Sequence, residues 1–441
     1  MKIVQKAAAV ILSAAMFVGL YFACMHYAVN IRTFYVDSPG TTNSSLDFKV
    51  TSMDRLIENY VNTGLERNIT ISGVGDIMFH EWQLERAYSQ STQTFDFSDS
   101  FTYMADALEA SDLLIGNLET TIAGKSQGKY ENFYGYGANL NDNNFNSPEA
   151  AVQNLADVGF DVLSTANEHA LDSGTQGLLS TLTNISNTDM TAIGTKAAAE
   201  DPDYVMTDVS GMKVGLIAAT NVLTTAADET NQGLIQTLDG YNEDKVQSLC
   251  ADIQQMRSEG AQAVIVVIHF GELYQEEADD QQKNLAHQLI EAGADVVFGS
   301  HPHTLEPIEI YPVTEDDGTS RNGVIIYSMG NFLSSQQYKG GTGNRDIGGL
   351  FDIVFGKQGD QVRIKEIHVT PTYVNWTDDA IAVVPVCEAH DASETFGDIF
   401  DSQAQARIDA AYETVIPQIL ERSGVQYTYS DYKYKIVVKN S

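Results

Sequence analysis

The feature that most constrains the fold of this chain is a series of short apolar runs that alternate with helix-like segments. The runs are rich in Val, Ile and Leu and give way to glycine or polar residues. They cover Ile69–Val74, Leu113–Ile115, Val162–Thr165, Val214–Ala218, Val264–Ile268, Val296–Phe298 and Val324–Tyr327. Continuous apolar runs of this length are typical of strands that are buried on both faces. They predict a layered α/β fold with polar loops at the strand ends.

Helical patterns lie between these runs. The predicted helices cover Phe101–Ala110, Pro148–Val158, Gly177–Ile185, Asp244–Ser258 and Gln281–Ala292. From Phe351 onward apolar residues alternate with polar ones, and a turn at Gly356–Asp360 predicts a hairpin with a bulge between Ile364 and Ile367.

The C-terminal tail carries two further patterns. Apolar residues at helical spacing predict an amphipathic helix around Ile408–Ile419, interrupted by Pro417. A last short strand is predicted at Tyr434–Val438.

The N-terminal segment predicts a membrane anchor. Lys2 and Lys6 precede an uncharged run, Ala7–Val29, which is long enough to cross a bilayer as a helix. The position of the lysines predicts a cytoplasmic N-terminus and a single-pass protein of the cell membrane, with the folded part extracytoplasmic. A cleaved signal peptide is the main alternative.

The charge balance bears on partners. The sequence contains 60 acidic and 25 basic residues, which give a formal net charge of −35. Such a surface repels the phosphates of nucleic acid, so we expect no nucleic-acid partner. The charge does not identify a substrate, because acidic surfaces mostly keep a protein soluble.

Polar motifs stand where the predicted strands end. They are Gly75-Asp76-Ile77-Met78, Gly116-Asn117-Leu118-Glu119, Asn167-Glu168-His169-Ala170-Leu171-Asp172, His269-Phe270-Gly271-Glu272, His301-Pro302-His303 and Gly330-Asn331-Phe332. A single Asp, Asn or His after a strand is more often a turn or cap residue than a ligand. Together, however, carboxylates, an amide and imidazoles make up the mixed nitrogen and oxygen set of a two-metal hydrolase.

Two of these motifs suggest specific roles. Pro302 restricts the preceding His301 to extended geometry, so we expect His301 and His303 on a stiff segment that suits a transition metal. His169 fits a general acid, because Asp172 lies three residues further on and can orient its ring if the segment begins a helix.

The order of the motifs G-D-x-M, N-L-E, A-N-x-H-A-L-D, H-x-G, G-A-D-x-x-x-G-S-H-P-H and Y-S-x-G-N-F resembles the CapA family of poly-γ-glutamate capsule biosynthesis proteins, which look like calcineurin-type metallophosphoesterases. The resemblance runs from about Ile69 to about Gln336. It implies a four-layered α/β/β/α metallophosphatase-like fold and participation in building or exporting an anionic polymer. The metal ligands that it implies are Asp76, Glu119, Asn167, His269, His301 and His303. It also places His169, with Asp172, as the acid.

Three positions depart from expected patterns, the first from that of metallophosphoesterases and the other two from that of the CapA family. Metallophosphoesterases generally place a histidine where this chain has Met78, so one metal position loses a strong ligand. Glu168 replaces the family's usual asparagine and is a further possible ligand. Leu273 stands where the family usually has a glutamate.

The resulting interpretation divides the chain into an anchor (residues 1–30), a spacer with a short helix around Met53–Tyr60 (31–68), a CapA-like domain (69–336) and C-terminal strands that complete the sheets, followed by the tail helix (337–441). The expected cofactor is a divalent ion: Mn, Zn, Fe or Mg. The expected partners are the membrane, poly-γ-glutamate or another anionic surface polymer, and capsule synthase subunits. An active metal-dependent phosphoesterase and a non-catalytic assembly component remain as alternatives.

Overall fold

The computed structural model of the protein describes residues 66–125, 136–139, 144–315, 318–338 and 343–439. Glu66–Ser441 form one compact unit by their internal contacts. The predicted anchor at Ala7–Val29, the short helix at Met53–Tyr60 and the spacer as far as residue 65 lie outside the described residues. The last residues of the predicted spacer, 67 and 68, already belong to the first strand.

The predicted localisation requires a correction. Within the described ranges, no helix has both the length and the apolar character needed to cross a bilayer. A membrane-spanning helix needs about 20 predominantly apolar residues, whereas α8 (Glu243–Ser258) has 16 residues and exposes charged side chains. The described residues therefore give no support to the predicted single-pass membrane protein.

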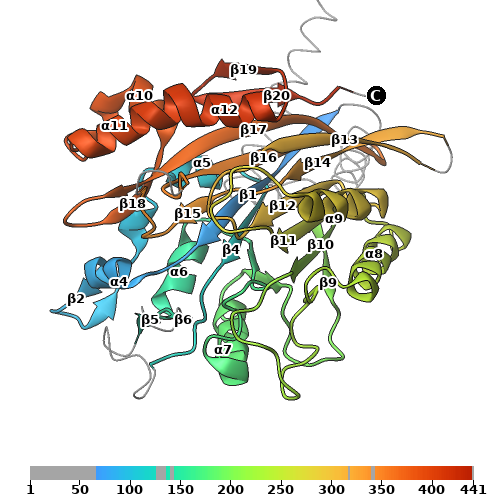
Figure 1. Cartoon of the computed structure of the whole chain (residues 1–441), viewed down its shortest axis with the longest axis horizontal. Coiled ribbons are helices and arrows are strands. Elements are labelled where there is room, and N and C mark those ends of the chain that lie inside the picture. The colour runs from blue at the N-terminus through green and yellow to red at the C-terminus, as the bar shows by residue number, and fades with distance from the viewer. Residues whose placement is uncertain (1–65, 126–135, 140–143, 316–317, 339–342, 440–441) are drawn as a thin grey trace, which may run out of the picture. The chain divides into compact units, whose positions relative to one another are not determined.

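A ten-stranded mixed sheet forms one layer (Figure 1). Its order is β19 (Tyr427–Ser430), β20 (Lys433–Val437), β17 (Gln361–Trp376), β16 (Ile347–Gln358), β1 (Arg67–Ile77), β4 (Leu113–Leu118), β7 (Val162–Ser164) and β8 (Thr191–Ile193). β15 (Asn331–Leu333) pairs with β1, and β18 (Ile381–Pro385) pairs with β17. The four strands from β1 to β8 in this order run parallel, whereas β16 is antiparallel to β1.

A six-stranded sheet forms the second layer. Its order is β13 (Ile308–Thr314), β14 (Ser320–Ile326), β12 (Val296–Ser300), β11 (Ala263–His269), β10 (Met212–Thr220) and β9 (Tyr204–Val209). The four central strands are parallel, and the two edge strands are antiparallel to their neighbours.

The two sheets share one apolar core. Ile69 and Ile71 of β1 belong to the same buried cluster as Ile265 and Val267 of β11. A Cβ atom added at Gly73 would lie 2.9 Å from the ring of Phe298, so the sheets approach closely at this glycine. Alternation along each strand sends the other side chains to the outer faces.

Helices cover both outer faces. α5 (Ala105–Glu109) and α6 (Ala150–Asp157) pack on the ten-stranded sheet around residues such as Leu114. α8 and α9 (Asp280–Glu291) pack on the six-stranded sheet around Val264 and Val266. The layer order is therefore helices, sheet, sheet, helices, and the predicted α/β class is confirmed.

The C-terminal region extends the first sheet. The register of β16 and β17 shifts between Val354 and Phe355, so that Lys365 is the extra residue, and the predicted bulged hairpin is confirmed. The tail forms α10 (Val386–Asp391), α11 (Ser402–Ala410), a π-helical turn η3 (Ala411–Val415) and α12 (Ile416–Arg422). Pro417 lies in the first turn of α12, directly after the π-helical turn, and its missing N–H interrupts the helical hydrogen bonds there.

Smaller elements complete the described structure. They are α4 (Glu81–Ala87), α7 (Gly174–Ser186), the pair β2 (Tyr88–Ser89) and β3 (Thr94–Phe95), and the pair β5 (Gly137–Asn139) and β6 (Asn144–Asn146). Short 3-10 turns occupy Ser98–Ser100 and Ser393–Phe396.

Candidate metal centre

The carboxyl ends of strands from both sheets deliver the predicted site residues to one place. Asp76 lies near the end of β1, Glu119 directly follows β4, and His269 ends β11. The loops after β7 and β12 supply the rest. The structure buries all eight predicted residues and joins them through hydrogen bonds and close polar contacts: Asp76, Glu119, Asn167, His169, Asp172, His269, His301 and His303. Their roles as ligands or acid stay predictions.

Glu119 lies at the centre of this cluster. Its Oε1 atom is buried and has no hydrogen-bond partner. Three imidazole Nε2 atoms surround that oxygen, from His303 at 3.8 Å, His269 at 3.9 Å and His169 at 4.0 Å.

These separations test whether the residues fit a metal ion. Two ligands that each bind at about 2.0–2.1 Å lie at most about 4 Å apart across the ion. Nitrogen and carboxylate atoms of Asp76, Glu119 and His303 also lie within 4.8 Å of one another. A buried carboxylate oxygen without a donor is costly, so the donor set around Glu119 fits a divalent cation.

A neighbouring donor group contains Glu168, which is one of the departures from the family pattern. Its Oε1 atom lies 3.1 Å from Nδ1 of His301 and 4.0 Å from Nε2 of His269. The hydroxyl of Thr224 donates to the other oxygen at 2.8 Å and so fixes the carboxylate. Glu168 therefore faces the histidines as a ligand would.

The two central carboxylates have opposite pKa shifts. Burial raises the pKa of Glu119, and the nearby charges of Asp76 and Glu168 raise it further. Burial acts in the same direction on Asp76, but the hydrogen bond and charge of His303, with the charge of His269, outweigh burial and lower the pKa of Asp76 to about 2. Glu119 therefore retains a proton more readily than Asp76, and a bound cation would replace that proton.

The predicted acid is held on two sides. Nδ1 of His169 lies 2.8 Å from Oδ2 of Asp172, and the backbone N–H of Phe145 donates to the same oxygen at 2.5 Å. The rings of His169 and Phe145 pack edge to face at 4.6 Å. Because Nδ1 faces Asp172, the other ring nitrogen of His169, Nε2, faces Oε1 of Glu119 at 4.0 Å.

Asparagine side chains tie the strand ends together. Nδ2 of Asn117 donates to Oδ1 of Asp76 at 2.8 Å. Nδ2 of Asn167 donates to Oδ1 of Asn117 at 3.1 Å and to the carbonyl of Leu118 at 2.8 Å. Oδ1 of Asn167 accepts the backbone N–H of His169 at 3.2 Å, so Asn167 already positions neighbouring residues.

The backbone of the histidine pair differs from the expectation. His301 has φ +101° and His303 has φ +61°, whereas Pro302 predicted extended geometry for His301. A non-glycine residue with such a φ is strained by about 1–3 kcal/mol and persists only where its surroundings hold it. The contacts of His301 with His269 and of His303 with Asp76 hold the two rings.

His80 is a buried residue of this region that the sequence motifs do not include. Its exposed fraction is only 9%. The backbone N–H of Ser335 donates to its Nδ1 at 3.2 Å, which leaves the ring proton on Nε2. Burial, with the charges of His303 and His169, lowers the pKa of His80 to about 3. Its position four residues after Asp76, before the first helix, was the available signal.

Met78 stands where metallophosphoesterases generally have a histidine, and it is accommodated by burial. The side chain is buried and packs with Phe145. Its sulfur lies 3.9 Å from the hydroxyl of Ser334. An apolar thioether therefore stands where a strong nitrogen ligand was expected from the metallophosphoesterase pattern.

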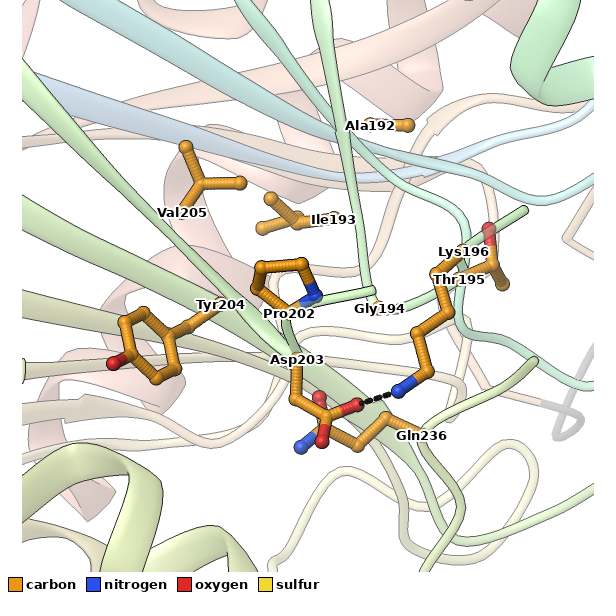
Figure 2. Close-up of a pocket in the computed structure, with 10 residues that line it drawn as sticks. All are labelled: Ala192, Ile193, Gly194, Thr195, Lys196, Pro202, Asp203, Tyr204, Val205 and Gln236. Carbon is orange, nitrogen blue, oxygen red and sulfur yellow. Dashed lines mark hydrogen bonds and ion pairs between the residues drawn. The ribbon is translucent and has the colours of Figure 1, made fainter. Parts of the chain in front are cut away.

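Figure 2 shows a different hollow, between β8 and β9, where Nζ of Lys196 lies 2.7 Å from Oδ1 of Asp203. Its volume is about 30 Å³, which is close to that of a single water molecule. This hollow is therefore too small to admit a substrate.

Comparison with known proteins identifies relatives of the chain. A family model described as bacterial capsule synthesis protein PGA_cap matches residues 70–336. The PGA biosynthesis protein CapA of Bacillus subtilis (strain 168) is 29% identical over 290 residues, which are 65% of this chain and 68% of that protein. The capsule biosynthesis protein CapA of Bacillus anthracis is 26% identical over 271 residues, which are 61% of this chain and 60% of that protein.

A third relative is a probable polyglutamine synthesis accessory protein of Mycobacterium tuberculosis, 26% identical over 239 residues, which are 53% of this chain and 58% of that protein. The chain thus matches only part of the length of each relative. The family model, by contrast, covers more than half of this chain. On that basis the chain belongs to the PGA_cap family of bacterial capsule synthesis proteins.

Proposed function

We propose that this chain takes part in the biosynthesis or export of poly-γ-glutamate, or of a related anionic surface polymer, and that its buried cluster holds a divalent metal ion. The family and the names of the relatives support the first part. The second part rests mainly on the buried Oε1 atom of Glu119, which lacks a hydrogen-bond partner and faces three imidazole nitrogens.

The fold supports a metallophosphatase-like ancestry for this site. Two packed sheets lie between two helical layers, and the cluster stands at the carboxyl ends of parallel strands from both sheets. Loops at such strand ends are the usual place for chemistry in α/β folds.

Six residues would hold the metal in this proposal: Asp76, Glu119, Glu168, His269, His301 and His303. Asn167 lies beside them, and its side-chain amide is already hydrogen-bonded to Asn117, Leu118 and His169. A mixed set of imidazoles and carboxylates suits Mn, Fe or Zn better than Mg, which prefers oxygen ligands. A divalent ion bound there would stabilise negative charge on a reacting oxygen as a Lewis acid.

A metal-dependent hydrolase is the second candidate function, and the arrangement of His169 favours it. Asp172 holds Nδ1 of the ring, so Nε2 is the atom that would give a proton to a leaving group. A screen of phosphate esters and amide substrates should compare the wild type with His169→Ala. Metal-dependent turnover that disappears in the variant supports catalysis, whereas turnover that persists removes His169 from the role of acid.

Met78 favours the alternative of an assembly component that binds a synthase subunit without catalysis, because one metal position lacks its expected histidine. The measurement is co-purification with capsule synthase subunits from polymer-producing cells. Recovery of these subunits that is unaffected by His301→Ala and His303→Ala supports assembly. Loss of the subunits in both variants ties partner binding to the metal centre.

Replacement of a relative tests the proposed function itself. Bacillus subtilis cells that lack their CapA relative would receive this chain, and the released poly-γ-glutamate would be measured. We expect the wild type to restore polymer and the Glu119→Gln variant to fail, at equal protein levels. No polymer with the wild type contradicts the proposed role, and equal polymer with both chains contradicts a role for the metal centre.

A further inference from the structure

His80 lies just beyond the carboxyl end of β1, four residues after Asp76. At this end β1 runs beside β15, where Asp76 pairs with Asn331. Two residues further on, the backbone N–H of Met78 donates to the carbonyl of Leu333 at 2.8 Å. The chain then enters α4 directly after His80. His80 therefore leaves the sheet at the same strand end as Asp76.

The two nitrogens of the His80 ring have different roles. The backbone N–H of Ser335 donates to Nδ1 at 3.2 Å. A ring nitrogen that accepts a hydrogen bond carries no proton, so the proton of the neutral imidazole stands on Nε2. Nε2 is therefore a hydrogen-bond donor in this structure.

Contacts on several sides hold His80 in place. Oε1 of Gln83 accepts the backbone N–H of His80 at 3.0 Å and also accepts the hydroxyl proton of Ser335. The ring of His80 packs edge to face with that of Phe145, with the centroids 4.9 Å apart. A donor that is fixed before a ligand arrives loses little conformational freedom when it binds.

Nε2 of His80 is open on one side. None of the residues that the structure describes forms a hydrogen bond with it. Unlike Oε1 of Glu119, it is not a fully enclosed atom, and the residue keeps 9% of its surface exposed. A fixed, nearly buried donor that can still be reached from outside is typical of the few polar groups that orient a bound ligand.

Two observations place this donor beside the metal centre. Phe145 packs edge to face on His80 and also on His169, so the two imidazoles flank one aromatic ring. Besides burial, the charges of His303 and His169 lower the pKa of His80, which requires that they lie nearby. The described donor groups that could hold an ion nevertheless do not include His80. It therefore lies next to the expected ligands without being one of them.

We propose that His80 recognises the ligand of the metal centre, and that its Nε2–H donates a hydrogen bond to an oxygen of a metal-bound oxyanion, either a phosphate or a carboxylate. This inference rests on the proposed metal site. A neutral imidazole suits the position, because it supplies a donor without adding a positive charge that would repel the metal ion.

The test measures how the full chain, loaded with Mn²⁺, binds inorganic phosphate and acetate in isothermal titration calorimetry. His80→Asn keeps an amide oxygen near the place of Nδ1, where Ser335 needs an acceptor, and removes the donor. His80→Gln instead extends an amide N–H toward the place of Nε2. We expect His80→Asn to weaken binding roughly tenfold or more, the scale of one hydrogen bond to a charged group, and His80→Gln to retain most of the affinity.

His368→Asn is the matched control and should bind both probes as the wild type does. His368 lies on β17, and its Nε2 faces Oε2 of Glu366 at 2.7 Å. Tighter binding of phosphate than of acetate identifies a phosphate group as the ligand, and the reverse identifies a carboxylate. A wild type that binds neither probe saturably overturns the proposal.

Stability should follow the opposite order, which separates recognition from a structural role. His80→Gln removes the acceptor of the Ser335 N–H, so it should lower the urea midpoint of unfolding more than His80→Asn does. Wild-type affinity in His80→Asn overturns the proposal, and so does an equal loss of affinity in both variants. Should His80→Asn fail to fold, His80→Phe keeps a ring against Phe145 without either nitrogen and should show the same loss of affinity.

Metal analysis of the same samples separates this inference from the proposed metal function. If wild type and His80→Asn carry equal Mn²⁺ and bind the probes equally, the metal proposal stands and the assignment of His80 fails. If the chain carries no metal but still binds a probe that His80→Asn weakens, the donor assignment stands and the metal proposal fails. Loss of metal from His80→Asn overturns the recognition role, because His80 would then support the metal ligands themselves.

Discussion

Oδ2 of Asp172 lies 2.8 Å from Nδ1 of His169 and also accepts the backbone N–H of Phe145. Asp172→Ala removes the acceptor for both groups in a buried place. We expect the free energy of unfolding to fall by about 1–3 kcal/mol, measured by urea denaturation. Asp189→Ala, at an exposed position, is the control and should change little. If the two variants unfold with the same free energy, the contacts of Asp172 with His169 and Phe145 do not contribute to stability.

Gly75 allows two backbone segments to meet beside Asp76. A Cβ atom added there would lie 1.9 Å from the carbonyl oxygen of Gly330, which accepts the backbone N–H of Asp76. Because neither backbone can move aside cheaply, Gly75→Ala should destabilise the protein by about 3 kcal/mol or more, the upper range of overpacking.

The control for this substitution is Gly349→Ala. The atoms nearest to its added Cβ would belong to the ring of Phe351, at 2.8 Å, and a side chain can shift. Thermal unfolding of both variants provides the comparison. A Gly75→Ala protein as stable as Gly349→Ala would contradict the close approach of the two segments.

Glu306 predicts a specific pH dependence of stability. Burial raises its pKa to about 8, from an ordinary value of 4.5, although Gln282 donates to Oε2 at 2.8 Å. Between these two pH values the folded chain keeps a proton that the unfolded chain has lost. The contribution of Glu306 to the free energy of unfolding is therefore full below pH 4.5 and is lost as the pH rises toward 8.

Glu306→Gln removes this titration and keeps the shape of the side chain. Relative to the wild type, the variant should gain a few kcal/mol of unfolding free energy between about pH 5 and pH 8, at about 1.4 kcal/mol per pKa unit. Urea denaturation at both pH values measures the gain. If the free energies of unfolding of variant and wild type differ by the same amount at both pH values, Glu306 is not neutral in the folded protein.

Metal binding should release protons. The pKa of Glu119 is raised by burial and by the charges of Asp76 and Glu168, so a cation that binds its carboxylate competes with a proton. The affinity for a divalent metal should therefore rise with pH. Calorimetry in buffers of different ionisation enthalpy counts the protons, and a binding heat that does not depend on the buffer would disagree with this picture.

Most of the central strands could be predicted from the sequence, and the edge strands could not. β11 and β12 are buried on both faces, and burial imposes a continuous apolar run that is visible in the sequence. β9 and β13 lie at sheet edges with partly exposed polar residues, so they carry no such run. Their places follow only from pairing with β10 and β14.

The candidate site shows the same division. His269 and Asp76 could be located because each stands at the carboxyl end of a strand that an apolar run predicts, β11 in one sheet and β1 in the other. The burial of His80 depends on the backbone N–H of Ser335, which is distant in sequence. The positive φ of His301 is fixed by its ring contacts and goes against the preference that Pro302 imposes.

Elemental analysis of protein purified without chelator tests the central claim most directly. The wild type should carry a divalent metal that Glu119→Gln and His303→Ala lose or bind much more weakly, while the exposed control Asp189→Ala retains it. The contradicting result is a wild type that carries no metal and whose thermal unfolding does not shift when Mn²⁺, Zn²⁺, Fe²⁺ or Mg²⁺ is added.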